Sequence, residues 1–217
     1  DHTIHCYHNT VHGQENFYSA FANSCNCAFA DMGLGLGGGT LKSTAEDLLF
    51  NKALPLNSYK TSRFTLDNDS SIGQGNTLVS PMHMALITSA IANDGVLMKP
   101  TMIDKIVNNS GDTVRETEKT EYKRLMTRNE ANILGKLMKN VVENGTASAL
   151  NGRGYTVAGK TGSAEFDENG SSHSWFVGYS NVDDPDIAIA VIVENGGTGS
   201  EAAVPIAADV FDAYYFD

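Results

Sequence analysis

The sequence predicts an α+β fold in which a mainly helical part, residues 1–150, precedes an antiparallel sheet backed by a C-terminal helix, residues 151–217. Three observations predict it. Apolar residues recur at helical spacing in the first two thirds, three strand-like runs follow, and an amphipathic stretch closes the chain. The 217 residues, 41% of them apolar, suffice for one sizeable core, so we expect a single domain or a large piece of one.

Helices are predicted from apolar spacing and from capping residues. Ser80-Pro81 and Thr127 are predicted helix starts, because a hydroxyl there satisfies a free N–H of the first turn. The tetrad Asn23-Ser24-Cys25-Asn26 is expected to interrupt a helical stretch, and the glycines between 33 and 39 to separate two helices. The predicted helices are 15–30 with its interruption, 40–50, 81–93, 128–143 and 201–215.

Strands are predicted from alternating patterns and from the turn residues between them. Two stretches around Asn109-Ser110-Gly111-Asp112 predict a hairpin over 101–118. Residues 1–15 indicate a strand and a loop, and 51–78 a polar loop. The last third predicts an antiparallel meander with Trp175 and Phe176 in its core, formed by 156–166, 173–180 and 187–194.

The composition limits the partners. A formal net charge of −11 repels phosphate backbones and anionic headgroups, so no nucleic acid is expected to bind. No run approaches the roughly 18 apolar residues of a membrane span, and we expect any anchor to lie upstream of Asp1. Cys6, Cys25 and Cys27 are too few for a disulfide scaffold and are expected to be small buried or half-buried thiols.

The tetrapeptide Lys160-Thr161-Gly162-Ser163 lies within a predicted strand and has the chemistry of an anion and peptide site. The ammonium supplies positive charge, the hydroxyls can hydrogen-bond a carboxylate, and the glycine lets another backbone approach the strand edge. A lysine-threonine-glycine tripeptide alone is a weak signal.

Ser24-Cys25-Asn26 is a second polar element, placed between two helical segments. Alone it is equally consistent with ordinary helix capping. Serine-x-asparagine and lysine-threonine-glycine, together with a serine-x-x-lysine nucleophile, form the signature set of active-site serine enzymes that recognise penicillin. Two of the three occur here in the expected order.

The residues around these motifs make the resemblance specific. Three successive segments, Ser71 to Gly75, Val79 to Ala85 and Ala92 to Val96, resemble the transpeptidase domain of class B penicillin-binding proteins. Ala158 to Glu165 followed by Ser174 to Tyr179 resembles two paired strands of that domain. The resemblance runs from about Asn16 to the end and implies the serine β-lactamase and penicillin-binding-protein fold, here incomplete.

One motif of the family is missing from these 217 residues. No serine is followed by a lysine three positions later, and the single hydroxyl with that spacing, Thr120 before Lys123, is interpreted as a structural coincidence. The resemblance places the nucleophile upstream of Asp1, so we expect the chain alone to be inactive. Cys25 replaces the aspartate of the common motif, with little change in function expected.

The resemblance implies a role for each matching residue. Ser24 would relay a proton and Lys160 would keep the site electropositive, while Asn26 would hold the substrate's peptide carbonyl. Thr161 and Ser163 would bind the terminal carboxylate.

Two further expectations concern the same strand. The N–H of Ser163 would form half of an oxyanion hole. Gly162 would line the substrate strand, and Glu165 is a candidate for shaping substrate preference.

No metal or cofactor is expected. His2, His5, His8 and His12 surround Cys6, but on a strand His2 and His8 would face away from His5. Gly33-x-Gly35-x-x-Gly38 has the glycine spacing of a dinucleotide-binding fingerprint. That fingerprint requires a strand before the glycines, and a helix is predicted there.

The functional prediction is a peptidoglycan D,D-transpeptidase domain at the extracytoplasmic face of the bacterial membrane. Its expected partners are the D-Ala-D-Ala stem peptide and, in the complete protein, β-lactams. The alternative is a non-catalytic peptide- or partner-binding module on the same fold. Because the missing segment would leave apolar surface on the 81–93 helix and the sheet, we expect self-association or a large groove there.

Overall fold

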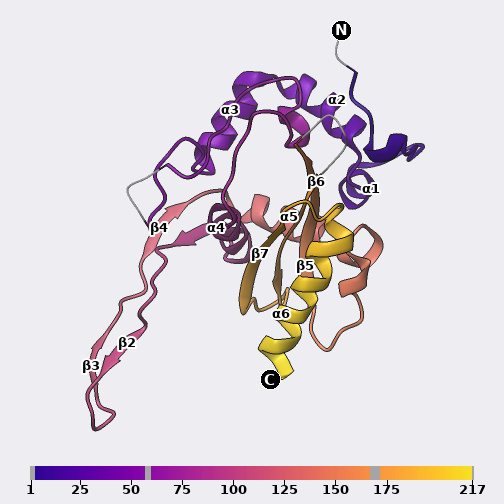
Figure 1. Cartoon of the computed structure of the whole chain (residues 1–217). Helices are drawn as coiled ribbons and strands as arrows, with labels where there is room; N and C mark the ends of the chain where they lie inside the picture. The colour runs from indigo at the N-terminus through magenta and orange to yellow at the C-terminus, as the bar shows by residue number, and fades with distance from the viewer. Residues whose placement is uncertain (1–2, 57–59, 167–171, 217) are drawn as a thin grey trace.

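A computed structural model describes residues 3–56, 60–166 and 172–216 (Figure 1). A helical layer, an antiparallel sheet with helices on both faces, and a projecting hairpin make up the molecule. The α-helices are α1 (Phe17–Ala22), α2 (Asn26–Leu36), α3 (Gly38–Asp47), α4 (Pro81–Ala92), α5 (Arg128–Asn144) and α6 (Val204–Phe216). The strands are β1 (Val96–Met98), β2 (Lys105–Val107), β3 (Thr113–Glu116), β4 (Glu121–Arg124), β5 (Val157–Glu165), β6 (Ser172–Ser180) and β7 (Ile187–Val193).

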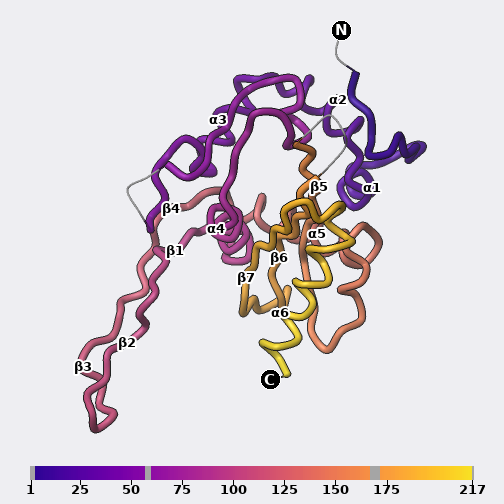
Figure 2. Tube along the Cα trace, in the orientation of Figure 1, coloured from indigo at the N-terminus to yellow at the C-terminus, as the bar shows by residue number. Residues whose placement is uncertain are grey.

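The main sheet has the order β5-β6-β7, so β6 is central and β5 forms one edge (Figure 2). Both pairs are antiparallel, with Lys160 opposite Val177 and Phe176 opposite Val191. The predicted meander and its closing helix are therefore confirmed.

The core lies on both faces of this sheet. On one face Phe176 and Val157 pack against Val204 and Phe211 of α6. On the other face Tyr179 and Ala158 pack with Met138 of α5, and α4 approaches from the same side.

Phe176 is fully buried as predicted, whereas Trp175 is only half-buried. A second cluster joins α4 to the β1–β4 pair through Leu86, Leu97 and Leu125.

The predicted helix starts are confirmed. Ser80 accepts a hydrogen bond from His83 N at the start of α4, which has proline at its first position. Thr127 and Glu130 form a reciprocal capping box at the start of α5. Each device satisfies N–H groups that the first helical turn leaves without partners.

Of two predictions near the N-terminus, the strand was wrong, and the separation of two helices by the glycines was confirmed at Gly37 alone. The described part of residues 1–15 contains no strand; it has a 3-10 turn (η1, Tyr7–Asn9) with His8 in the left-handed region. The glycine run is mostly helical, because α2 passes through Gly33 and Gly35 and only Gly37, with φ of 77°, separates it from α3. Gly33 is needed in the helix because a Cβ there would lie 2.3 Å from Ser71 Cβ.

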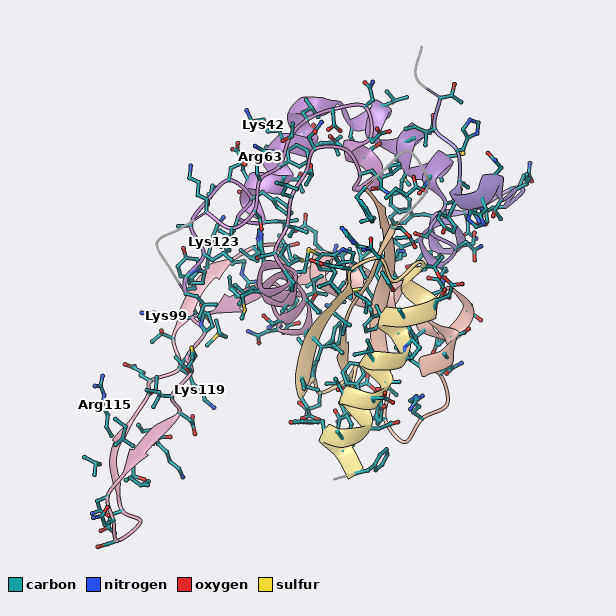
Figure 3. The ribbon with its side chains drawn as sticks, in the orientation of Figure 1. Lys42, Arg63, Lys99, Arg115, Lys119 and Lys123 are labelled. Carbon is teal, nitrogen blue, oxygen red and sulfur yellow. The ribbon has the colours of Figure 1, made fainter. Side chains whose placement is uncertain are left out.

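The predicted hairpin is the β2–β3 pair, which projects from the body as the hairpin arm, residues 99–120 (Figures 1 and 2). The side chain of Asn108 accepts hydrogen bonds from Ser110 N and Asp112 N and so closes its turn. The antiparallel β1–β4 pair at its base was not predicted. All 15 lysines and arginines lie between residues 42 and 160, and several follow the arm and the α3 side (Figure 3).

Candidate active site

The Ser24 tetrad forms the tight link between α1 and α2. Helix α1 is closed at its start by a capping box on Asn16, and Ser24 then adopts a φ of 56°, which is costly for a residue with a side chain. The Cys25 N–H donates to Ala20 O at 2.9 Å, so the turn stays packed against α1. The predicted interruption of the helix is confirmed, and the turn directs the Ser24 hydroxyl toward β5.

Lys160 reaches Ser24 from the edge strand. Its Nζ donates to Ser24 Oγ at 2.7 Å and to the carbonyl oxygen of Thr161 at 2.8 Å, and it lies 5.9 Å from the centre of the Phe21 ring. Burial lowers the pKa of the Lys160 ammonium from 10.5 to about 8, because the charged form loses hydration. Such an amine can gain or lose a proton near neutral pH.

The outer edge of β5 faces an open space. The carbonyl oxygens of Thr161 and Ser163, two residues apart and so on the same edge, accept hydrogen bonds from the side chains of Lys160 and Gln74. Gly162 has little room for a side chain, since a Cβ would lie 3.3 Å from Trp175 Cβ.

Two hydroxyls of the same strand are held by neighbours. Thr161 Oγ1 hydrogen-bonds Thr146 Oγ1 at 2.5 Å, and Ser163 Oγ accepts from the Gly199 N–H at 3.3 Å. Gly199 begins a π-helical turn (η4, Gly199–Ala203), and a Cβ there would lie 2.6 Å from Trp175 O. The turn therefore lies directly against the two strands.

A cavity of about 1150 Å³ brings these parts together. Every predicted site residue lines it: Ser24, Asn26, Lys160, Thr161, Gly162, Ser163 and Glu165. The Asn26 amide donates to the carbonyl oxygen of His5 at 3.0 Å, and Glu165 is exposed at the end of β5. Lys160 is the single lysine or arginine among the described lining residues, so it is the lysine or arginine there that can provide a positive countercharge for an anionic ligand.

Sequence reasoning missed several residues of this wall. Gln74, Thr146 and Gly199 position the β5 edge but belong to loops or to the start of a short helical turn, where no periodicity marks them. Gln74 could have been found, because it lies within the Ser71 to Gly75 segment that carried the family resemblance.

The structure gives no site to the Thr120–Lys123 pair or to the glycine fingerprint. Lys123 donates to Asp47 O at 3.1 Å and neither it nor Thr120 lines the cavity. The glycine fingerprint begins inside α2, so the strand that a dinucleotide site requires before it is replaced by a helix. Of the described residues, Cys6, His12 and Cys25 are grouped closely enough to hold a metal ion.

The fold and the cavity define a class of protein, and comparison with known families identifies it. The penicillin-binding protein transpeptidase domain model matches residues 1–212. The chain belongs to this family. Its fold is the mixed helix and antiparallel sheet of penicillin-binding proteins.

Among curated relatives, the chain is 32% identical over 206 residues to peptidoglycan D,D-transpeptidase PbpA of Mycolicibacterium smegmatis, covering 86% of this chain and 41% of that protein. It is 30% identical to penicillin-binding protein 3 of Bacillus subtilis, covering 84% and 28%, and 30% identical to MrdA of Acinetobacter baumannii, covering 94% and 35%. The chain thus spans less than half the length of these relatives.

Solved structures of penicillin-binding proteins also match the fold of this chain. The D,D-transpeptidase domain of a peptidoglycan glycosyltransferase from Eggerthella lenta matches with a TM-score of 0.81 and 27% identity, covering 95% of this chain and 54% of that one. The penicillin G acyl-enzyme complex of penicillin-binding protein A from M. tuberculosis matches with 0.82 and 27%, covering 96% and 51%. Among the described residues, none of the helices has the length and apolarity needed to cross a bilayer.

Proposed function

We propose that this chain is the part of a peptidoglycan D,D-transpeptidase that binds the D-Ala-D-Ala end of a stem peptide and moves protons during acyl transfer. The observation that carries the proposal is the 2.7 Å hydrogen bond from Lys160 Nζ to Ser24 Oγ on the wall of the large cavity. Relatives named peptidoglycan D,D-transpeptidase support it.

In the proposed reaction, a serine oxygen supplied by the rest of the protein attacks the penultimate D-Ala carbonyl. The C–N bond to the last D-Ala breaks and leaves an acyl-serine. An amine of a neighbouring stem then attacks the acyl carbonyl, the ester C–O bond breaks, and the serine oxygen regains a proton from the attacking amine. Ser24 passes the serine's proton to the leaving amine. The hydrogen bond between Ser24 and Lys160 suits this task. An amine with a pKa of about 8 can hold or release a proton near neutral pH, and both forms of the amine can hydrogen-bond the Ser24 hydroxyl.

The β5 edge is the proposed binding site for the substrate. Thr161 and Ser163 hydrogen-bond the terminal carboxylate, Lys160 supplies its countercharge, and the Ser163 N–H stabilises the oxyanion. Asn26 holds the peptide carbonyl; its amide now donates to His5 O, an exposed contact that a ligand can replace. Glu165, exposed at the cavity rim, contacts the more distant part of the stem peptide.

The nucleophile is the component that this chain lacks. No serine-x-x-lysine occurs in its sequence, so we propose that the 217 residues alone neither form a covalent penicillin adduct nor turn over substrate. The parent protein would work at the extracytoplasmic face of the membrane, where peptidoglycan and β-lactams are accessible.

The test uses the parent protein, with its nucleophile, labelled by fluorescent penicillin. We expect Lys160→Ala to slow acylation at least about 100-fold, the scale of losing one positioned electrostatic or proton-transfer group. Lys136→Ala, which removes an exposed lysine from α5, should leave the rate unchanged. Acylation that is unaffected by Lys160→Ala, with loss of peptide binding, would instead favour a non-catalytic binding module.

A second measurement examines the chain itself. After incubation of the purified 217 residues with fluorescent penicillin and denaturing electrophoresis, no label should remain on the protein. A label that survives denaturation would show a nucleophile within this chain and would contradict the proposal.

A further inference from the structure

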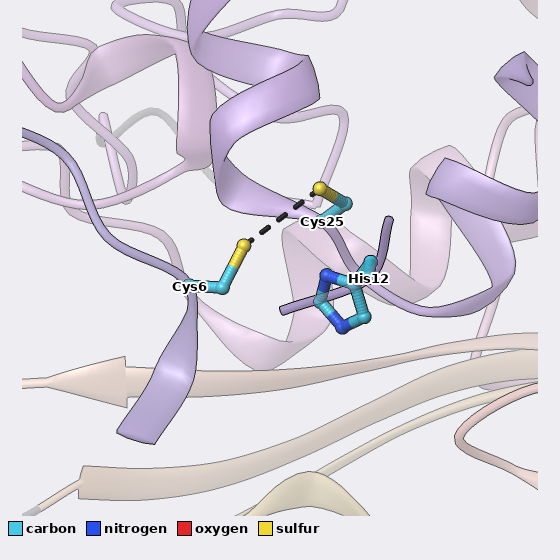
Figure 4. Close-up of side chains that lie close together, drawn as sticks. All are labelled: Cys6, His12 and Cys25. Carbon is cyan, nitrogen blue, oxygen red and sulfur yellow. Dashed lines mark hydrogen bonds between the residues drawn. The ribbon is translucent and has the colours of Figure 1, made fainter. Parts of the chain in front are cut away.

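Three metal-ligating side chains meet beside the cavity. Cys6 precedes η1, His12 follows it, and Cys25 precedes α2 within the Ser24 turn (Figure 4). Their ligand atoms all lie within 4.8 Å of one another, and the Sγ atoms of Cys6 and Cys25 are 3.7 Å apart. Cys6 and Cys25 are buried and His12 is half-buried. Two segments that are 19 residues apart thus converge on one point.

The distances fit a tetrahedral metal better than a covalent bond. Two zinc–sulfur bonds of about 2.3 Å at a tetrahedral angle would separate the sulfurs by roughly 3.8 Å. A disulfide requires about 2.05 Å, far shorter than the 3.7 Å found here. The sulfurs already have the spacing of two zinc ligands.

His12 supplies an independent observation. Its Nδ1 is buried and has no hydrogen-bond partner within the described parts of the chain. A buried imidazole nitrogen without a partner loses the free energy of its hydration, and a metal ion in the Cys6–His12–Cys25 group would restore a ligand to it.

The donor set selects the kind of ion. Two thiolates and one imidazole are the ligands of zinc, and soft sulfur disfavours magnesium and calcium, which prefer oxygen. Cys27 has its Sγ 3.7 Å from that of Cys6 but is exposed and lies outside the three-ligand group. A fourth position remains for water or another ligand.

We propose that Cys6, His12 and Cys25 bind a zinc ion that fastens the N-terminal segment to the Ser24 turn. The expectation of no metal rested on histidines alternating along a strand, and this segment is not a strand. Cys25 lies between Ser24 and Asn26, and Asn26 already donates to His5 O. The ion would therefore hold the cavity wall that carries Ser24.

The test measures zinc in the purified protein, prepared with a phosphine reductant and zinc and then passed through gel filtration. The wild type should retain about one zinc per chain. Cys6→Ser, His12→Gln and Cys25→Ser should each lose most of it. Two matched controls, Cys27→Ser and His8→Gln, remove an exposed thiol and an exposed histidine of the same region and should retain it.

A second readout follows the coordination directly. Cobalt substitution should give thiolate-to-cobalt absorption in the wild type and both controls, and chelation should lower the Tm of these three proteins only. Zinc loss in the controls equal to that in the ligand variants would show non-specific binding and overturn the proposal. So would a Cys6–Cys25 disulfide in the non-reduced protein, or a wild type that retains no zinc.

Discussion

Two features of the Lys160 site have opposite effects on the charge of its side chain. Its ammonium donates to Ser24 Oγ and the Thr161 carbonyl, which favours the charged form, yet burial lowers its pKa to about 8. Burial has the larger effect, so the neutral amine is readily available. At the residue scale, this balance is what the proposed function requires of one side chain that is both a countercharge and a partner in proton transfer.

The lowered pKa predicts how stability depends on pH. Between about 8 and 10.5 the unfolded chain keeps the Lys160 proton while the folded chain loses it, so the free energy of unfolding should rise with pH in this window. The rise should be at most about 3 kcal/mol, from 1.36 kcal/mol per pKa unit. Urea unfolding of the wild type and of Lys160→Met checks it, because the variant should lack this increment. Parallel pH profiles of the two proteins would contradict the assignment.

Individual site residues differed in how far the sequence could predict them. The Lys160 strand follows from alternation and from its glycines, but the hydrogen bond to Ser24 spans 136 residues, and only the family resemblance brought the two together. The group of Cys6, His12 and Cys25 was missed because the strand predicted for residues 1–15 assigned the wrong side-chain directions. Local patterns encode which residues are polar, and the chain's long-range packing decides which of them meet.

At the scale of elements, capping and periodicity predicted α4 and α5 well because each has a hydroxyl cap and an apolar face. The three-residue β1 and four-residue β4 were missed, since such short runs carry little alternation and depend on pairing with each other. Helix α2 contains Gly33 and Gly35 although glycine disfavours helices by about 1 kcal/mol, which shows that packing overrode local preference.

The contact between the ends of α1 and α5 gives a prediction for these elements. A Cβ on Gly145 would lie 2.4 Å from the carbonyl oxygen of Ala22, which accepts a hydrogen bond from Thr146 N. Gly145→Ala should therefore lower the free energy of unfolding by at least about 1 kcal/mol and displace the Ser24 turn. Chemical denaturation measures the loss.

Gly39→Ala is the matched control for that substitution. Gly39 lies inside α3, and a Cβ there would contact nothing within 4 Å. The change should raise stability by about 0.5 to 1 kcal/mol, because alanine favours the helix. Equal effects of the two substitutions would mean that the contact with Ala22 is unimportant.

For the whole molecule, β7 is the edge strand of the sheet opposite β5. It pairs with β6, and within the described residues no strand pairs with its other edge. All seven of its side chains are apolar and half-exposed, and no charge protects the edge against pairing with another chain. The large cavity lies at the opposite, β5 side of the sheet, and no residue of α4 or β7 lines it.

This free edge predicts self-association with a second copy of the chain, edge to edge. Sedimentation velocity should show dimers that increase with protein concentration. Ile192→Lys, which places a charge on β7, should shift the equilibrium to monomer. Ile106→Lys on the remote hairpin arm should not. A monomer at every concentration, or equal dissociation by both variants, would refute the prediction.

The separation of Ser24 and Lys160 along the chain also bears on the order of synthesis. The Ser24 turn leaves the ribosome before its partner on β5, which is added 136 residues later, after α4, α5 and the whole hairpin arm. Until then a nascent chain has a strained serine turn but no amine opposite it. Translation that stops before β5 therefore yields fragments in which the Ser24 side of the cavity lacks its β5 side, and the two sides meet only after Lys160 has been added.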